Sequence, residues 1–253
     1  MNRIYAEKVD INPDNVKDFY NSQAESIGNM KNPFSAVLLS NHSPELIEEQ
    51  MKIEKEILFP KLKINNESRV LDIGCGIGRW AQQIIPQCKS YWGIDFSQKM
   101  IDAAKERTSN FDNANYKFER MSFQDFAAKT LDTKFNKVII SAVLMYICDN
   151  DIKESIKRLA KLLDEECVIF IQESCGIGQR LTLKDFPSQA LNAKYNVIYR
   201  TKEEYDDFFE VFTDAGFSVS FSQYYSKLGG KVSYSDTDKI YYIIEKEAKG
   251  RKL

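Results

Sequence analysis

The chain has 253 residues, of which 43% are hydrophobic and 28% are charged, so it can form a sizeable core as one large domain or as a domain with a lid. Its 35 basic and 37 acidic residues give a formal net charge of −2, which argues against a strongly basic nucleic-acid binder or a basic membrane-surface protein. The sequence has no apolar run of about 18 residues and no apolar stretch at its N-terminus, so neither a transmembrane helix nor a secretory signal is expected.

The N-terminal zone, residues 1–65, is polar, and from Pro44 onward its apolar residues fall mostly on one face of a helix that ends near Pro60. Residues 66–175 alternate short apolar runs with helical patterns. Strand–helix alternation on this scale predicts an α/β fold, with a parallel sheet, right-handed crossovers and helices on both faces. The expected strands are 70–73, 91–95, 116–120, 137–141 and 167–172, and the expected helices are 79–85, 98–107 and one that Asp149 caps and that continues to Leu163.

The last zone, residues 176–253, begins with a stretch that we expect to be irregular and polar, at 176–196. No internal repeat, low-complexity tract or Pro/Gly linker divides the chain. The elements predicted after this stretch are a helix over 202–215, ended by Gly216, and two strands at 218–225 and 239–246.

The segment at 70–78, VLDIGCGIG, joins a strand, an acid at its end and three glycines before a helix. Glycines let backbone N–H groups approach a ligand closely near a helix N-terminus. A second strand ends in Asp95, 17 residues beyond Gly78, where a carboxylate can accept hydrogen bonds from a ribose diol. The acid at Asp72 suits a ligand with a positively charged amine and disfavours a pyrophosphate, and no Walker-type GKS or GKT follows. The pattern favours S-adenosylmethionine (SAM), which carries an amine, a sulfonium and a ribose.

The run VLDIGCGIGRWA, followed by YWGIDFSQKMIDAAKER, resembles class I SAM-dependent methyltransferases of the small-molecule type, strongly over about residues 66–175 and more loosely toward the C-terminus. This resemblance implies a Rossmann-like seven-stranded, mostly parallel sheet whose antiparallel last strand enters between its neighbours. It also implies SAM as cofactor and S-adenosylhomocysteine as product. The expected organisation is an N-terminal helical lid over 1–65 and a SAM-binding core over 66–253 with an insert at about 174–200.

The resemblance also implies roles for single residues. Asp72 matches the acid near the amino end of the cofactor, and Asp95 matches the acid that binds the ribose. The chain departs from the family at Ser122, where many relatives have an acid that binds the adenine amino group, and at Asn136, where an acid often begins the fourth strand. The expected cofactor-binding residues are Tyr20, Asp72, Gly74, Gly76, Asp95, Phe96, Met100, Ser122, Phe123 and Ser141.

Methyl transfer requires the acceptor atom to lie in line with the methyl group, and it requires a base if the acceptor is a hydroxyl. The candidate bases are His42, the one histidine of the chain, and Glu173, at the end of a predicted strand. A capping or surface histidine and a solvated loop acid are the alternative interpretations. The candidate acceptor-binding residues are Tyr146, Tyr199 and Arg200, although Arg200 could equally be a surface arginine at the start of a helix.

The expected reaction is O-methylation of a sugar, nucleotide-linked or phosphorylated intermediate, as in surface-polysaccharide or capsule assembly. N- or carboxyl-methylation of a small metabolite is the alternative, and a non-catalytic SAM-binding partner subunit stays open because of the departures at Ser122 and Asn136. A nucleic-acid methyltransferase is disfavoured, since SAVLMY replaces the NPPY-type loop and no basic stripe is evident.

The expected surroundings of the protein follow from its composition. One histidine and five cysteines, none of them in a CxxC pair, predict no metal site and favour a reducing cytoplasm. The expected partner is a small-molecule acceptor, without nucleic acid or membrane, for a monomer or homodimer.

Overall fold

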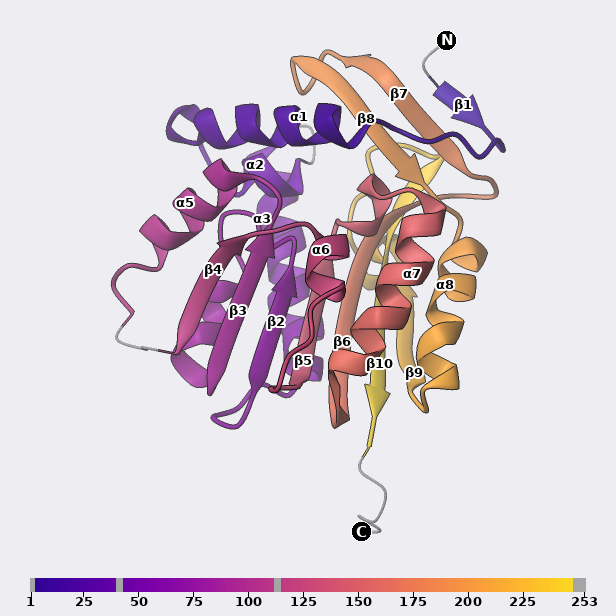
Figure 1. Ribbon diagram of the computed structural model, residues 1–253. Helices are drawn as coiled ribbons and strands as arrows, with labels where there is room; N and C mark the ends of the chain where they lie inside the picture. Colours follow the sequence, from indigo (N-terminus) through magenta and orange to yellow (C-terminus); the bar gives the residue numbers. More distant parts are fainter. Residues whose placement is uncertain (1–2, 40–42, 112–114, 248–253) are drawn as a thin grey trace.

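The computed structural model describes residues 3–39, 43–111 and 115–247, and its central layer is a seven-stranded sheet of order β4-β3-β2-β5-β6-β10-β9 (Figure 1). Neighbouring strands from β4 to β6 pair in parallel, whereas β10 is antiparallel to both β6 and β9 and lies between them. The Rossmann-like sheet with an antiparallel last strand is thereby confirmed. The strands are β2 (Arg69–Ile73), β3 (Ser90–Asp95), β4 (Tyr116–Arg120), β5 (Phe135–Ser141), β6 (Leu163–Gly176), β9 (Ser218–Tyr224) and β10 (Thr237–Lys246).

Helices cover both faces of this sheet because successive residues of a strand point to opposite sides. Val138 and Ile140 of β5 pack in the cluster formed with α6, α7 and α8, while Ile139 packs on the other face with α4 and α5. In the part of the chain that is described, no helix is long and apolar enough to cross a membrane. The helices are α1 (Pro13–Glu25), α2 (Ser35–Leu38), α3 (Pro44–Ile53), α4 (Ala81–Ile84), α5 (Gln98–Arg107), α6 (Phe123–Ala127), α7 (Asp149–Leu159) and α8 (Lys202–Asp214).

The N-terminal segment contains the helices α1, α2 and α3. After α3 the chain continues through a π turn, η3 (Glu54–Leu58), and a 3₁₀ turn, η4 (Phe59–Leu62), so the helical path ends close to the predicted Pro60. The prediction that Asp149 caps the following helix is wrong by one position. Cys148 is the N-cap and Asp149 is the first helical residue of α7. The carboxylate of Asp149 binds Arg180 and Arg200.

The stretch predicted to be irregular, 176–196, instead contains most of a β-hairpin. Strands β7 (Leu181–Ser188) and β8 (Ala193–Tyr199) pair with each other, and β1 (Arg3–Tyr5) adds to the edge of β7 to give a second sheet of order β1-β7-β8. Its apolar side chains pack with those of α1. Figure 1 shows α1 and this hairpin above the carboxyl ends of the parallel strands, which is the edge where open α/β sheets bind ligands.

Candidate active site

The loop after β2 leaves no space for a side chain at Gly74 or Gly76. Gly74 and Gly76 have φ of +69° and +53°, a left-handed conformation that glycine adopts without steric cost. A Cβ atom at Gly74 would lie 2.3 Å from Cγ2 of Val143, and one at Gly76 would lie 2.8 Å from Cγ1 of Val37. The two glycines therefore form a close cradle, and both line a cavity at the carboxyl edge of the sheet.

Asp95 ends β3 beside this cradle and also lines the cavity. Its Oδ2 accepts a hydrogen bond from the N–H of Gly76 at 3.1 Å, and its Oδ1 accepts one from the N–H of Ser97 at 2.9 Å. Burial raises the pKa of Asp95 to about 6, although the two backbone N–H groups act to lower it. The carboxylate is thus fixed in place, and each oxygen keeps a lone pair for a ligand.

Asp72 lies beneath the same loop and is buried. The hydroxyl of Tyr91 donates to its Oδ2 at 2.5 Å, whereas its Oδ1 has no hydrogen-bond partner among the described residues. Burial raises the pKa of Asp72 to about 7. The hydrogen bond from Tyr91 and the positive charge of Arg79 act to lower it.

The cavity, which we call the cofactor cavity, brings the predicted cofactor residues together. Nine of the ten line it, and Asp72 does not. Ser122, the departure from the family, is the N-cap of α6: its hydroxyl accepts from the N–H of Asp125 and donates to Oδ2 of the same residue at 2.7 Å. The nine residues that line the cavity are Tyr20, Gly74, Gly76, Asp95, Phe96, Met100, Ser122, Phe123 and Ser141.

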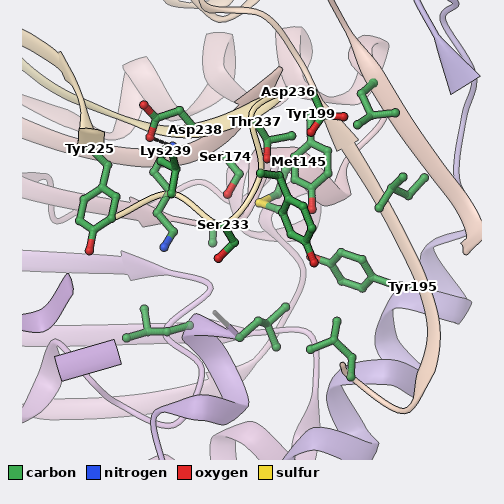
Figure 2. A pocket seen from close by; sticks show the side chains of 18 of the residues that line it. Met145, Ser174, Tyr195, Tyr199, Tyr225, Ser233, Asp236, Thr237, Asp238 and Lys239 are labelled. Carbon is green, nitrogen blue, oxygen red and sulfur yellow. Dashed lines mark hydrogen bonds between the residues drawn. The ribbon is translucent and has the colours of Figure 1, made fainter. Parts of the chain in front are cut away.

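A second cavity, the acceptor cavity, lies against the first and shares Val37, Ala142 and Tyr146 with it. The β7–β8 hairpin, the N-terminal segment and residues 231–239 enclose it. Figure 2 shows tyrosine and serine side chains around this space, with Lys239 reaching into it. The predicted acceptor residues Tyr146 and Tyr199 both line the acceptor cavity.

Three tyrosine hydroxyls form a chain where the two cavities meet. Tyr20 of α1 donates to Tyr146 at 2.8 Å, and the hydroxyl of Tyr146 lies 2.6 Å from that of Tyr195 on β8. Burial raises the pKa of all three above the usual range. The hydroxyls are therefore neutral near pH 7 and act as hydrogen-bond donors and acceptors instead of as bases.

Lys239, which the sequence did not single out, lines the acceptor cavity together with two other cationic residues, Arg3 and Lys231. The Nζ of Lys239 donates to Oε1 of Gln50 at 2.5 Å, and burial lowers the pKa of Lys239 to about 8. The sequence does contain a sign that Lys239 is unusual, because it begins the otherwise apolar run KIYYII of β10. A lysine there pairs with a ligand or a buried acceptor, since a buried cation needs a partner.

Two of the residues predicted for catalysis or acceptor binding line neither cavity. Glu173 and Arg200 are fully buried and line neither. Glu173 accepts three backbone N–H groups, and Arg200 binds Asp149 and two backbone carbonyls. The alternative interpretations, a solvated loop acid for Glu173 and a surface arginine for Arg200, are also wrong, because both side chains are buried. His42 lies outside the described residues.

A protein-family model and several curated proteins match the sequence of this chain. The model of a methyltransferase domain matches residues 64–247. Phosphoethanolamine N-methyltransferase 1 of Caenorhabditis elegans is 23% identical over 168 residues, which cover 66% of this chain and 33% of that protein. An uncharacterized methyltransferase of Schizosaccharomyces pombe is 31% identical over 112 residues, 41% of this chain and 38% of that protein. The chain thus spans only about a third of the length of these curated relatives.

Two solved structures share the fold. Phosphoethanolamine N-methyltransferase 1 of Haemonchus contortus, in complex with phosphoethanolamine and S-adenosylhomocysteine, superposes with a TM-score of 0.71 at 16% identity and covers 95% of this chain and 50% of that one. Magnesium protoporphyrin IX methyltransferase of Synechocystis PCC 6803 with bound SAM superposes with a TM-score of 0.59 at 15% identity and covers 93% of this chain and 97% of that one.

Proposed function

The chain belongs to the methyltransferase domain family, whose class I members use SAM, and on this premise we propose that it transfers a methyl group from SAM to a small molecule held in the acceptor cavity. The observation that carries the proposal is the pair of adjoining cavities that share Tyr146 and Ala142. One cavity is built from the glycine cradle and Asp95, and the other is lined by hydroxyl groups and a half-buried lysine, Lys239. Two ligands held side by side are what a group transfer requires.

The residues of the cofactor cavity fit SAM, which supplies a methyl group already activated on a sulfonium. The backbone of Gly74 and Gly76 would hold its methionine portion, and the carboxylate of Asp95 would accept hydrogen bonds from its ribose. Phe96 and Met100 give an apolar wall for the adenine. Asp72 would balance the positive charge from beneath the loop.

We propose that the acceptor is a small phosphorylated molecule and that the methylated atom is an amine nitrogen. Lys239 offers a cation to an anionic group in the acceptor cavity. The names of the curated relatives support this acceptor class, since several are phosphoethanolamine N-methyltransferases. A neutral amine attacks with its own lone pair, and the hydroxyls of Tyr146 and Tyr195 can accept a hydrogen bond from an N–H group and so orient it.

O-methylation of a sugar or nucleotide-linked phosphate in surface-polysaccharide or capsule assembly is the second candidate. The tyrosine and serine hydroxyls of the acceptor cavity would suit a hydroxylated ligand. A hydroxyl acceptor needs a base, for which His42 remains the sequence candidate.

We also propose that residues 1–65 act as a lid together with the insert at about 174–200. Tyr20 of the first segment and Tyr195 of the second both bind Tyr146 of the core by hydrogen bonds. Each segment therefore contributes a wall to the space between the cavities, and neither needs to be a separate domain.

Transfer of labelled methyl from SAM tests the proposal. The acceptors are phosphoethanolamine, ethanolamine without the phosphate, glucose 1-phosphate and a UDP-sugar. We expect labelled product from phosphoethanolamine and at least about tenfold less from ethanolamine. Label in the sugar compounds alone would favour the second candidate. Failure to bind SAM in a calorimetric titration would refute the methyltransferase assignment itself.

A further inference from the structure

The loop between β5 and α7, residues 142–148, lies between the two cavities and carries Tyr146. Ala142 has a φ of +56°, a conformation that a residue other than glycine keeps only when its surroundings hold it. Its N–H donates to the carbonyl of Gln172 at 2.7 Å. A single 3₁₀ turn, η6 (Leu144–Tyr146), follows and ends at Tyr146, whose hydroxyl contacts the hydroxyls of Tyr20 and Tyr195.

Glu173, near the end of β6, holds the N–H groups of this loop. Its Oε1 accepts hydrogen bonds from Val143 at 3.0 Å and Leu144 at 2.9 Å, and its Oε2 accepts one from Met145 at 3.1 Å. The first N–H groups of a helical turn have no partner within the turn. The carboxylate of Glu173 supplies that partner from beneath the loop, and it is fully shielded from solvent.

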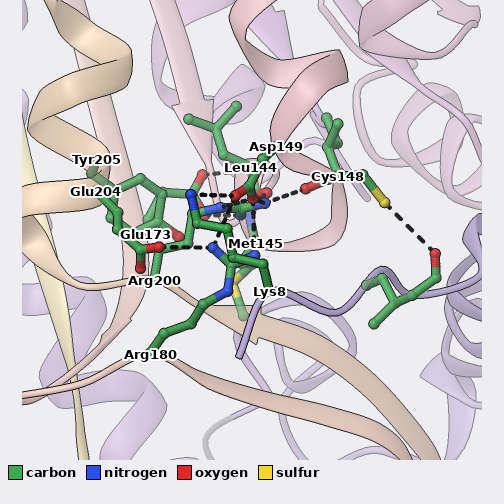
Figure 3. A network of polar contacts seen from close by, with 12 residues as sticks. Lys8, Leu144, Met145, Cys148, Asp149, Glu173, Arg180, Arg200, Glu204 and Tyr205 are labelled. Carbon is green, nitrogen blue, oxygen red and sulfur yellow. Dashed lines mark hydrogen bonds and ion pairs between the residues drawn. The ribbon is translucent and has the colours of Figure 1, made fainter. Parts of the chain in front are cut away.

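Arg200, just after β8, holds the carbonyl groups of the same loop. Its Nη1 donates to the carbonyl of Leu144 at 2.8 Å and its Nη2 donates to that of Ile147 at 2.6 Å, while Asp149 binds its Nε and Nη2 at 2.9 and 2.7 Å. Figure 3 shows Glu173, Arg200 and Asp149 gathered around Leu144. Asp149 also binds Arg180, so both ends of the hairpin are tied to the start of α7.

We propose that Glu173 and Arg200 are positioning residues that fix Tyr146 at the boundary between the cofactor and acceptor cavities. Two side chains of opposite charge bind the backbone N–H and carbonyl groups of one short loop. The loop is therefore held in a single arrangement. Tyr146 can then bind Tyr20 and Tyr195 at once and present its hydroxyl to the acceptor. The last step rests on the proposed function, whereas the fixed orientation of Tyr146 does not.

The orientation is tested by placing 3-fluorotyrosine at position 146 alone and recording the ¹⁹F resonance of the full chain. Glu173→Gln keeps the shape of the side chain but replaces one accepting oxygen with a donor. We expect one sharp resonance in the wild type and in Glu154→Gln, the same change on the exposed face of α7. We expect a broadened or split resonance in Glu173→Gln and in Arg200→Lys, which loses the guanidinium fork.

An unchanged resonance in folded Glu173→Gln would overturn the proposal, and folding is checked by the melting curve. If Glu173→Gln does not fold, Arg200→Lys decides the question by the same criterion. If neither variant folds, the two residues serve the fold as a whole and the proposal is wrong.

A kinetic cycle then tests whether the two residues act through Tyr146. We expect Glu173→Gln to lower kcat at least about tenfold with the KM for SAM unchanged, and to have an effect below about twofold in a Tyr146→Phe background. An equal loss of kcat in both backgrounds would contradict the proposal. If no acceptor is methylated by the wild type, the proposed function fails, while the fluorine experiment still decides the role of Glu173 and Arg200.

Discussion

Replacing Asp95 with asparagine is the most direct test of the cofactor cavity. The substitution keeps the shape of the side chain and removes its charge. Each carboxylate oxygen already accepts one backbone N–H, from Gly76 and from Ser97, and has a lone pair left for a ribose hydroxyl. A hydrogen bond to a charged group contributes about 1.5 kcal/mol or more, so two of them amount to about 3 kcal/mol, or about 100-fold in Kd.

Calorimetric titration with SAM measures this loss, and a melting curve shows that the variant is folded. Asp102→Asn is the matched control, because Asp102 is exposed on α5 and bonds only to Gln98 in the described contacts. We expect the control to bind SAM like the wild type. A folded Asp95→Asn protein that binds SAM within about threefold of the wild type would refute the ribose assignment.

Three further outcomes are expected. Burial raises the pKa of Asp72 from 3.8 to about 7, so the stability that this group contributes is fully present below pH 3.8 and is lost as the pH rises through 7. Denaturant unfolding at several pH values should show that the free energy of unfolding depends less on pH in Asp72→Asn than in the wild type. An unchanged pH dependence would contradict the argument. Gly74→Ala should lower the melting temperature and weaken SAM binding, because its Cβ would meet Val143 at 2.3 Å; a variant with wild-type melting and SAM affinity would show that the cradle is not needed. Lys239→Met should raise the KM for a phosphorylated acceptor at least about tenfold and leave the Kd for SAM unchanged; an unaltered KM would exclude Lys239 from acceptor binding.

The core sheet could be predicted from the sequence because its signals are local. Helix α5 and strand β4 match the predicted ranges at both ends, since the periodic pattern and the flanking polar residues coincide there. The cofactor cavity could be predicted for a related reason. Gly76 lies in the loop just after β2 and Asp95 ends the neighbouring parallel strand β3, so their positions in the sequence already place them together.

The acceptor side could not be predicted in the same way. The sequence predicts an irregular stretch where β7 and β8 form a hairpin, because the polar residues of the hairpin hide the alternation and its apolar face is covered by a helix from the N-terminal part of the chain. Glu173 and Arg200 were expected to contact ligands. Their partners are backbone groups and, for Arg200, the carboxylate of Asp149, all of them 28 or more residues away, at positions that no spacing rule connects. Tertiary contacts alone decide whether such a charge faces a cavity or a loop.

The two cavities differ in how much of the chain each one needs. Every residue that lines the cofactor cavity lies between Pro13 and Ile147, whereas the acceptor cavity draws on residues from Arg3 to Lys239. Strand β1 can join the hairpin only after about 180 more residues have been synthesised, since Arg3 pairs with Leu183. During translation the residues that line the cofactor cavity therefore leave the ribosome first, and the acceptor cavity closes only after Lys239 has followed.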